Sequence, residues 1–274
     1  MSLSDADFAY VRDVVYRQAA IVLEKEKNYL VEARLTPLVR RHGFDSLEAL
    51  VAQMRTQPQN GMQWHVIEAM TTNETSFFRD VYPFDLLKKS VLPELIKKRA
   101  ALRQLNIWCA AASSGQEPYT ILMVLRDSFP ELASWKINFI ATDISKEMID
   151  RCREGCFSQL EVNRGMPAPL LVKYFSKIGT EWQIKEELRR AIDFRQMNLA
   201  QSWPALPPID FIFMRNVLIY FDFETKKQIL ARVRKTMKPD GYFFLGGAET
   251  TLNIDESFKR VQIDKAAYYQ LASA

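Results

Sequence analysis

The chain has 274 residues, of which 48% are hydrophobic and 26% charged, as in an ordinary globular protein with one large domain or two modest ones. Its formal net charge of +4 suits a weakly basic surface facing an acidic partner but is too small to indicate nucleic acid by itself. No apolar run approaches the ~20 residues that span a bilayer, and the acidic, amphipathic start is unlike a signal peptide. We therefore expect a cytoplasmic protein without direct membrane insertion.

The cysteines and histidines narrow the chemistry further. The three cysteines are Cys109, Cys152 and Cys156, and the two histidines are His42 and His65. Without a secretory signal, this cysteine usage favours a reducing compartment. Cys152 and Cys156 are four residues apart, but no histidine lies near them in the sequence, so we expect no metal site. Neither histidine accompanies a nucleophile motif, which argues against a Ser-His or Cys-His hydrolase.

Residues 1–70 show helical periodicity and predict an all-α N-terminal domain. A first helix begins at Ser4 or Asp5. Its apolar face consists of Phe8, Val11, Val15 and Ala19. The segment "NYLVEARLTPLVRRHG" predicts a second helix ended by Gly43, and "DSLEALVAQMRTQ" a third capped by Asp45. A fourth helix is expected at "WHVIEAMTTN".

After a linker at 71–91, a domain at 92–274 alternates between strand and helix patterns. The expected strands are 105–110, 137–142, 192–197, 209–214, 241–246 and one near 263–271, and the expected helices are 116–128, 145–154 and 223–237. Such alternation predicts an α/β fold with a doubly wound, mostly parallel sheet covered by helices on both faces. The polar stretch at about 155–190 interrupts the alternation and predicts a small inserted antiparallel β unit.

A turn of small residues, "AAASSGQEP", follows the first strand of this domain, where open α/β sheets bind ligands. A phosphate cradle would need a glycine-rich loop with a lysine or a G-x-G-x-x-G spacing. Here Gly115 is the one glycine, and the carboxylate of Glu117 would repel a pyrophosphate. The turn therefore suits a ligand with a positive charge. Alternatively it is only a tight turn, with Glu117 interacting favourably with the helix dipole.

The second strand ends at Asp143, where a carboxylate can accept hydrogen bonds from two ribose hydroxyls. Alternatively, Asp143 or Ser145 caps the following helix. A carboxylate for ribose and a second one near the first turn, without a phosphate cradle, describe a nucleoside with a cationic tail. S-adenosylmethionine fits this description better than NAD. The missing G-x-G-x-x-G argues against a dinucleotide-binding oxidoreductase.

Five motifs carry a resemblance to a known family. They are "AMTTNETSFFRD" at 69–80, "IWCAAASSGQEPYTI" at 107–121, "ATDIS" at 141–145, "FMRNVLIYFD" at 213–222 and "MKPDGYFFLGGAET" at 237–250. In this order and spacing, over nearly the whole chain, the sequence resembles the chemotaxis receptor methyltransferases, the CheR family of protein-glutamate O-methyltransferases. The resemblance implies methyl transfer from S-adenosylmethionine to glutamate side chains of chemoreceptor cytoplasmic domains (methyl-accepting chemotaxis proteins), with S-adenosylhomocysteine as product. It also implies a monomer.

The resemblance transfers a set of site residues to this sequence. The implied cofactor-binding positions are Asn73, Thr75, Arg79, Glu117, Asp143, Asn198, Leu199, Arg215 and Asn216. Arg79 and Tyr220 would lie near the reacting methyl, and Arg79 would also orient the substrate carboxylate. Tyr220 alternatively serves packing, and Phe77 and Phe78 are expected in the core. A methyltransferase-like sensor or scaffold that binds the cofactor without methylating receptors stays an alternative function.

Two regions bear on docking. The second helix carries Arg34, Arg40 and Arg41, of which Arg34 and Arg41 share a face if Pro37 is accommodated. The resemblance favours contact of these arginines with the acidic methylation region of a receptor. A solvated basic face is the alternative, and nucleic-acid binding lacks a recognised RNA module. In the inserted unit, "YFSKIGTEWQIKEEL" has only Gly179 where some family members carry a glycine-rich loop, so we expect methylation without a receptor C-terminal pentapeptide tether.

Overall fold

The computed structural model describes residues 3–57 and 61–272, in two compact units. The helical unit contains Met1–Thr72 together with Leu199–Gln201 and Tyr220–Lys226. The sheet unit contains Asn73–Asn198, Ser202–Ile219 and Lys227–Ala274. No helix within the described ranges is long and apolar enough to cross a membrane.

The helical unit has the four expected helices. They are α1 (Asp5–Ala19), α2 (Asn28–His42), α3 (Leu47–Thr56) and α4 (Met62–Met70), with a 3₁₀ turn, η1, at Lys25–Lys27. The predicted apolar face of α1 is buried, and α1 begins as expected because the Ser4 side chain accepts the N–H of Asp7 at 3.1 Å. The helix α2 continues through Pro37 and ends at Gly43, whose φ of 70° is left-handed.

The prediction that Asp45 caps the third helix is wrong. Ser46 is the N-cap of α3, and its hydroxyl accepts the N–H of Ala49 at 3.2 Å. An N-cap side chain must reach the amide two or three residues ahead, and Asp45 lies one residue outside that range. Serine and aspartate are about equally good caps, so the sequence alone did not decide between them.

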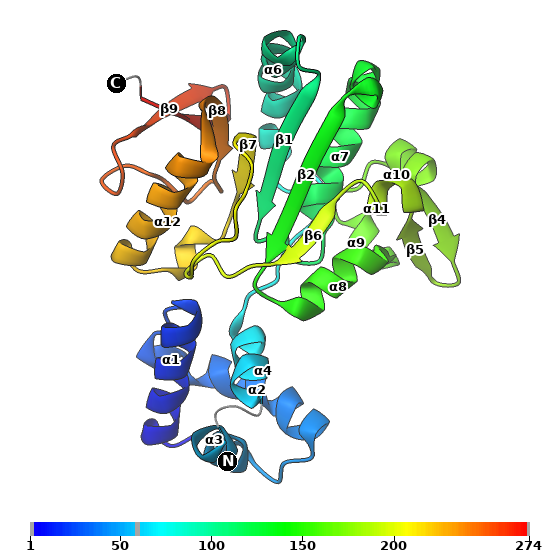
Figure 1. The fold of residues 1–274 in the computed structure, drawn as a ribbon. Helices are drawn as coiled ribbons and strands as arrows, with labels where there is room; N and C mark the ends of the chain where they lie inside the picture. Colours follow the sequence, from blue (N-terminus) through cyan, green and yellow to red (C-terminus); the bar gives the residue numbers. More distant parts are fainter. Residues whose placement is uncertain (1–2, 58–60, 273–274) are drawn as a thin grey trace. The chain divides into compact units, whose positions relative to one another are not determined.

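The sheet unit is built on the expected doubly wound sheet (Figure 1). Its strands are β1 (Gln104–Ala110), β2 (Lys136–Asp143), β6 (Asp193–Gln196), β7 (Ile209–Met214), β8 (Met237–Phe244), β9 (Phe258–Ile263) and β10 (Ala266–Leu271). Their order is β6-β2-β1-β7-β8-β10-β9, and β10 alone pairs antiparallel with both of its neighbours. Two predictions need correction, because β8 begins before residue 241 and the expected last strand is a hairpin of β9 and β10.

The strand order places a ligand-binding edge between β1 and β7. From β1 the chain passes through α7 (Gln116–Ser128), β2 and α8 (Lys146–Glu154) to β6, moving one way across the sheet. From β7 it passes through α12 (Phe223–Thr236) to β8, moving the other way. Right-handed crossovers therefore put α7 and α8 on one face and α12 on the other. The carboxyl ends of β1 and β7 meet where this direction reverses.

A helical stretch that was not expected from the sequence precedes β1, at the end of the linker 71–91 and the start of the domain 92–274. It consists of α5 (Tyr82–Leu86), the π-helical segment η2 (Leu87–Val91) and α6 (Leu92–Arg99). Its buried residues include Phe84, Leu87, Val91 and Leu95, which belong to the main hydrophobic core. Their spacing of three and four residues is the helical period, so the signal was present in the sequence.

The inserted unit is a three-stranded antiparallel sheet, as predicted. It contains β3 (Cys156–Ser158), β4 (Phe175–Ile178) and β5 (Glu181–Ile184), in the order β3-β5-β4, with short helices α9 (Gln159–Asn163), α10 (Ala168–Tyr174) and α11 (Glu186–Arg189). The pairing of Ile178 with Glu181 leaves a two-residue turn at Gly179 and Thr180. Gly179 adopts a φ of 61°, which explains the one glycine of this hairpin.

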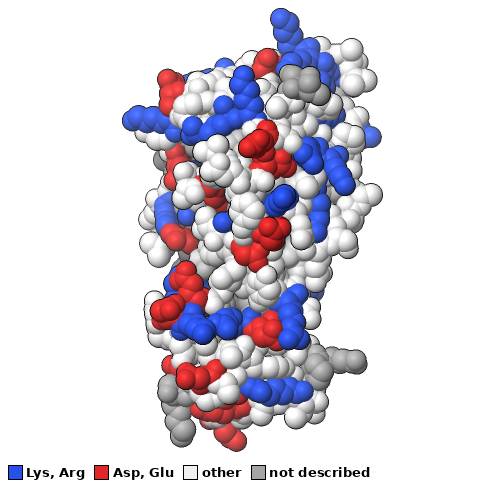
Figure 2. All heavy atoms as spheres, turned by 90° about the vertical axis from the view of Figure 1, so that its left-hand side faces the viewer, with Lys and Arg blue, Asp and Glu red and all other residues white. Residues whose placement is uncertain are grey.

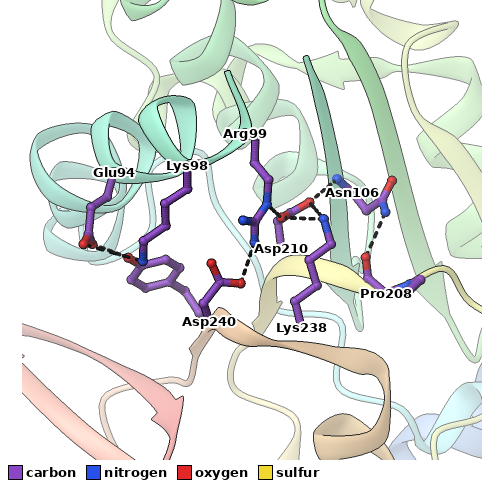
Figure 3. Close-up of polar contacts among 9 residues, drawn as sticks. Glu94, Lys98, Arg99, Asn106, Pro208, Asp210, Lys238 and Asp240 are labelled. Carbon is purple, nitrogen blue, oxygen red and sulfur yellow. Dashed lines mark hydrogen bonds and ion pairs between the residues drawn. The ribbon is translucent and has the colours of Figure 1, made fainter. Parts of the chain in front are cut away.

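The amino ends of the strands are joined by a buried ion-pair cluster (Figure 3). The fully buried carboxylate of Asp210 accepts from Arg99 Nε at 2.7 Å, from Lys238 Nζ at 2.8 Å and from the Asn106 N–H at 2.8 Å. Arg99 also contacts Asp240 at 2.5 Å, which lowers the pKa of the Asp240 carboxyl. This cluster fastens α6 to β1, β7 and β8.

On the molecular face drawn in Figure 2, basic and acidic side chains are interspersed, in keeping with the small net charge.

Candidate functional site

The turn between β1 and α7 is built from alternating left-handed residues. Ala111, Ser113 and Gly115 have φ values of 56°, 51° and 98°. The φ of Gly115 favours glycine, and a Cβ there would be tightly packed, 3.1 Å from Cys152 Sγ and 3.2 Å from the Tyr119 ring. Strained backbone of this kind persists only where the surrounding structure holds it in place, and it is often found at ligand-binding sites.

Asp143, at the carboxyl end of β2, holds this turn from the neighbouring strand. Its Oδ2 accepts the Ser113 N–H at 2.8 Å and its Oδ1 accepts the Ser145 N–H at 2.9 Å. The alternative role as helix cap falls to Ser145, whose hydroxyl accepts the Met148 N–H at 3.2 Å. These two bonds place both carboxylate oxygens of Asp143 at the turn after β1, at the edge of the sheet where open α/β sheets bind ligands.

Glu117 and Arg215 form a buried ion pair at the carboxyl ends of β1 and β7. The Glu117 side chain is 10% exposed and the Arg215 side chain 1%, and Arg215 Nη1 donates to Glu117 Oε2. Arg215 Nη2 donates to Asp80 Oδ2 at 2.6 Å and to the Arg79 carbonyl at 3.1 Å. The Sγ of Cys109 lies 3.6 Å from Glu117 Oε1, and burial together with this carboxylate raises the pKa of the Cys109 thiol. Arg215 therefore links the first turn to the segment before α5.

The linker residues expected to reach the cofactor belong to the sheet unit. The carbonyl of Asn73 accepts from Ser113 Oγ at 2.9 Å, which joins the linker to the turn after β1. Thr75 and Arg79 are half-buried, and Arg79 Nη1 donates to the Glu74 carbonyl at 2.7 Å. The linker is strained where it enters α5. Left-handed φ values occur at Phe78, Asp80 and Val81.

The predicted core role of the linker phenylalanines is confirmed. Phe77 is fully buried in the main core, and Phe78 is partly buried against it. A Cβ added at Gly165 would lie 2.1 Å from the Phe77 carbonyl oxygen, so the inserted unit approaches the linker backbone closely. The linker is thus packed on the sheet unit and its polar residues are presented next to the turn.

Glu249 is not among the residues expected from the sequence, but it holds the loop that carries two candidate site residues. Its carboxylate accepts four backbone N–H groups, those of Asn216, Val217, Leu218 and Gly246, at 2.7–2.8 Å. A Cβ at Gly246 would lie 2.7 Å from Asn216 Nδ2, so glycine permits this approach. Glu249 thereby fixes the loop after β7 that carries Arg215 and the left-handed Asn216. An acidic residue two positions after the glycine pair of "GGAET" was the available signal.

Three expected site residues lie where the chain passes between the two units. Asn198 follows β6 in the sheet unit, whereas Leu199 and Tyr220 are grouped with the helical unit. Leu199 is buried, and the carbonyl of Tyr220 accepts the Val22 N–H at 3.0 Å. Tyr220 is half-buried in a 3₁₀ turn, η4, at Leu218–Tyr220.

The arginines of α2 have different environments. Arg34 Nη1 donates to the carbonyls of Met70 and Thr71 at 2.6 and 3.1 Å, and its Nη2 donates to Thr72 Oγ1 at 2.7 Å. Burial lowers the pKa of the Arg34 guanidinium, and the nearby Tyr220 opposes this effect. Arg34 thus closes the end of α4 inside the helical unit. Arg40 and Arg41 are exposed at the end of α2.

The residues of the sheet unit fit a nucleoside with a cationic tail. The Asp143 carboxylate lies beside the backbone turn after β1, and Glu117 supplies negative charge to the same edge of the sheet. Glu117 is already bonded to Arg215, so a ligand ammonium would share this carboxylate with the guanidinium. No lysine-bearing phosphate loop is present in the turn, in keeping with a ligand that carries no phosphate.

Comparisons with known proteins agree with this arrangement. Residues 73–267 match the S-adenosylmethionine-binding domain of CheR methyltransferases, and residues 6–71 match their all-alpha domain. The fold and the site together define an S-adenosylmethionine-dependent methyltransferase. The chain is 40% identical to a chemotaxis protein methyltransferase of Pseudomonas putida over 98% of this chain and 99% of that protein. It is 42% identical, with the same coverage, to one of Pseudomonas aeruginosa, and 35% identical to one of Vibrio cholerae. The chain belongs to the CheR family of chemotaxis methyltransferases.

Proposed function

We propose that this protein transfers the methyl group of S-adenosylmethionine to glutamate carboxylates on the cytoplasmic methylation helices of chemoreceptors. The observation that carries the proposal is the match of both CheR domains, in order, together with relatives of 40–42% identity named chemotaxis protein methyltransferases. The receptor and its glutamates are the partner class that this family implies.

The chemistry needs positioning more than acid–base catalysis. When bound, the sulfonium of the cofactor supplies an electrophilic methyl group. A glutamate with a reference pKa of about 4.3 is ionised at neutral pH, so its oxygen can attack without a general base. The chain's own residues then have two tasks, to hold the nucleoside and to align the carboxylate. Asp143 and Glu117 serve the first task in this proposal.

Arg79 and Tyr220 serve the second task. Arg79 is half-buried, and one of its guanidinium nitrogens donates to the Glu74 carbonyl, which leaves further N–H groups to hold a carboxylate. Arg79→Ala should lower turnover strongly, whereas Tyr220→Phe should lower kcat with nearly unchanged cofactor affinity. Full activity of the Tyr220→Phe variant would reduce the tyrosine to a packing role.

Docking is proposed to depend on α2 and not on a tether. Arg40 and Arg41 are exposed, so they can steer an acidic receptor segment within a Debye length of about 8 Å at physiological salt. Arg34 contributes differently, because its guanidinium is bonded to the end of α4. The two-residue turn at Gly179 and Thr180 offers no extended loop beside β4 to clamp a receptor C-terminal pentapeptide.

One experiment tests the reaction directly. The protein is incubated with methyl-labelled S-adenosylmethionine and receptor cytoplasmic fragments, and base-labile methyl release is measured. Label should appear in the fragment and disappear when the acceptor glutamates are changed to alanine. Cofactor binding without label transfer would instead favour a sensor or scaffold.

The docking proposal has its own measurement. Charge reversal of Arg40 and Arg41 should raise the KM for the receptor fragment, and added salt should do the same for the wild type. A free pentapeptide should not bind measurably in a calorimetric titration. Micromolar peptide binding would contradict tether independence, and unchanged receptor kinetics of the charge-reversed protein at low salt would contradict the role of α2.

A further inference from the structure

A small hollow lies next to the loop after β7, within the sheet unit. Its volume is about 160 Å³, and it is bounded by the segment entering α5, by the loop after β8, and by β9 and β10. The residues that matter for its chemistry are Asp80, Tyr82, Arg215, Glu249, Arg260 and Lys265. Arg215 and Glu249 belong also to the cofactor edge described above, so the hollow adjoins that edge.

The two carboxylates of the hollow are already engaged. Asp80 is paired with Arg215 at 2.6 Å, and Glu249 accepts four backbone N–H groups. Arg215, Arg260 and Lys265 outnumber these two carboxylates, so the charged side chains that line the hollow carry a net positive charge. Asp80 thus holds the linker through Arg215, and Glu249 holds the loop after β7.

Two cations of the hollow keep their charge available. Arg260 is exposed, and within residues 3–57 and 61–272 its side chain has no hydrogen bond or ion pair. Lys265 is exposed and lies 3.3 Å from the Tyr82 hydroxyl, with its Nζ 5.2 Å from the centre of that ring. A neutral phenol leaves the positive charge of Lys265 uncompensated. Arg215 adds a buried Nε with no partner among the described residues.

Strand pairing aims Arg260 at the hollow. Arg260 is directly opposite Tyr269 of β10, which also lines the hollow, and paired residues of an antiparallel ladder share one face. The preceding residue, Lys259, pairs with Gln270 and points to the other face. The chain thus offers an exposed lysine one residue away that does not line the hollow.

We propose that this hollow is a subsite for an acidic side chain of the protein substrate. Arg260 and Lys265 hold a carboxylate of the methyl-accepting polypeptide, beside the edge where the cofactor binds. The inference rests on the proposed receptor methylation and names a surface of the sheet unit that selects acidic segments. The volume suits one side-chain carboxylate, and Arg260 and Lys265, which have no carboxylate partner among the described residues, provide charge-assisted hydrogen bonds for it.

The test compares charge reversal inside and outside the hollow. The double variant Arg260→Glu with Lys265→Glu should raise the KM for a receptor cytoplasmic fragment roughly five- to tenfold, with kcat and S-adenosylhomocysteine affinity within about twofold of wild type. The variant Lys259→Glu serves as matched control and should change the KM less than twofold. Neutralisation in Arg260→Gln with Lys265→Gln should give a smaller rise in KM and checks that the effect follows charge.

The outcomes separate this subsite from the proposed function. A wild-type protein that transfers no methyl to the fragment overturns receptor methylation and the subsite with it. Normal wild-type transfer with an unchanged KM in the double variant overturns the subsite alone. An equal KM rise in Lys259→Glu overturns it too, because the effect would then come from net charge and not from the hollow.

Discussion

Arginine–carboxylate clusters occur at both ends of the central sheet, and they differ in how completely they are satisfied. At the amino ends, Asp210 is enclosed by Arg99, Lys238 and a backbone N–H (Figure 3). At the carboxyl ends, Arg215 joins Glu117 to Asp80 but keeps an Nε without a partner among the described residues. The first cluster is complete by itself, whereas the second retains capacity for another group.

The backbone conformation around the two clusters also differs. The amino-end cluster joins regular elements, α6, β1, β7 and β8, and one left-handed residue, Arg103, lies between α6 and β1. The carboxyl-end cluster lies beside left-handed residues, among them Ser113 and Asn216, in loops that other side chains hold in place. A buried charge pair alone is weak evidence for a binding site, because structural pairs perturb the same groups. A donor without a partner among the described residues, together with left-handed backbone, distinguishes the carboxyl-end cluster from the amino-end cluster.

The largest expected effect is on the amino-end cluster. Asp210→Ala should lower the free energy of unfolding by about 3–5 kcal/mol, because Arg99 and Lys238 would lose their buried anion. Cofactor affinity of the folded variant should be unchanged in calorimetry. A loss of less than about 1 kcal/mol in denaturant titration, or a lower cofactor affinity, would contradict a purely structural role of the amino-end cluster.

The next largest effect is expected on cofactor affinity, at Asp143 near the carboxyl-end cluster. Asp143→Ala should weaken S-adenosylmethionine binding by about 1–3 kcal/mol, because ribose hydroxyls lose a charged acceptor and the Ser113 N–H loses its partner. Ser145→Ala is the matched control, since it removes the cap of α8 and should lower stability by about 1 kcal/mol while sparing affinity. Equal cofactor affinities of the Asp143 variant and wild type would remove this residue from the site.

A smaller effect is expected at Glu249. Replacing its carboxylate by an amide in Glu249→Gln turns one acceptor into a donor facing N–H groups, which should cost about 1–2 kcal/mol of stability. The loop with Arg215 and Asn216 should loosen, so hydrogen exchange of its amides should accelerate and cofactor affinity should fall. The exposed Glu256→Gln should change neither quantity. Unaltered exchange at residue 216 would show that the loop holds its conformation without this carboxylate.

The smallest effect concerns acid stability. Contact with Arg99 lowers the folded-state pKa of Asp240, so its contribution to stability is present above the unfolded pKa of about 3.9 and is lost as pH falls through the lower folded value. Because Asp240 is partly exposed, Asp240→Asn should cost less than about 1 kcal/mol at pH 7. Urea midpoints of variant and wild type should converge as the pH falls below about 3.9. A gap that persists at the lowest pH would assign it to another cause.

Hydrophobic periodicity predicted the bounds of helices and strands best where an element is largely buried. The helix 116–128 and the strand 209–214 coincide with α7 and β7. Predictions failed where short-range signals competed, as at Asp45 against Ser46, or where a turn was inconspicuous, as between β9 and β10. The helix α5 lies within the expected linker 71–91, and α6 lies at the start of the domain 92–274, where no helix was expected before the first strand.

The sequence by itself determined the class of fold, the cofactor type and the carboxylates that follow β1 and β2, since these depend on local patterns and on motifs close together along the chain. Only the tertiary structure decided that Glu117 is bound by Arg215, that Arg34 closes α4, and that Glu249 holds the loop after β7. Glu117 and Arg215 are 98 residues apart, and Glu249 contacts amides up to 33 residues away. Hydrogen-bond partners at such separations follow from strand order and register, which residue spacing alone does not specify.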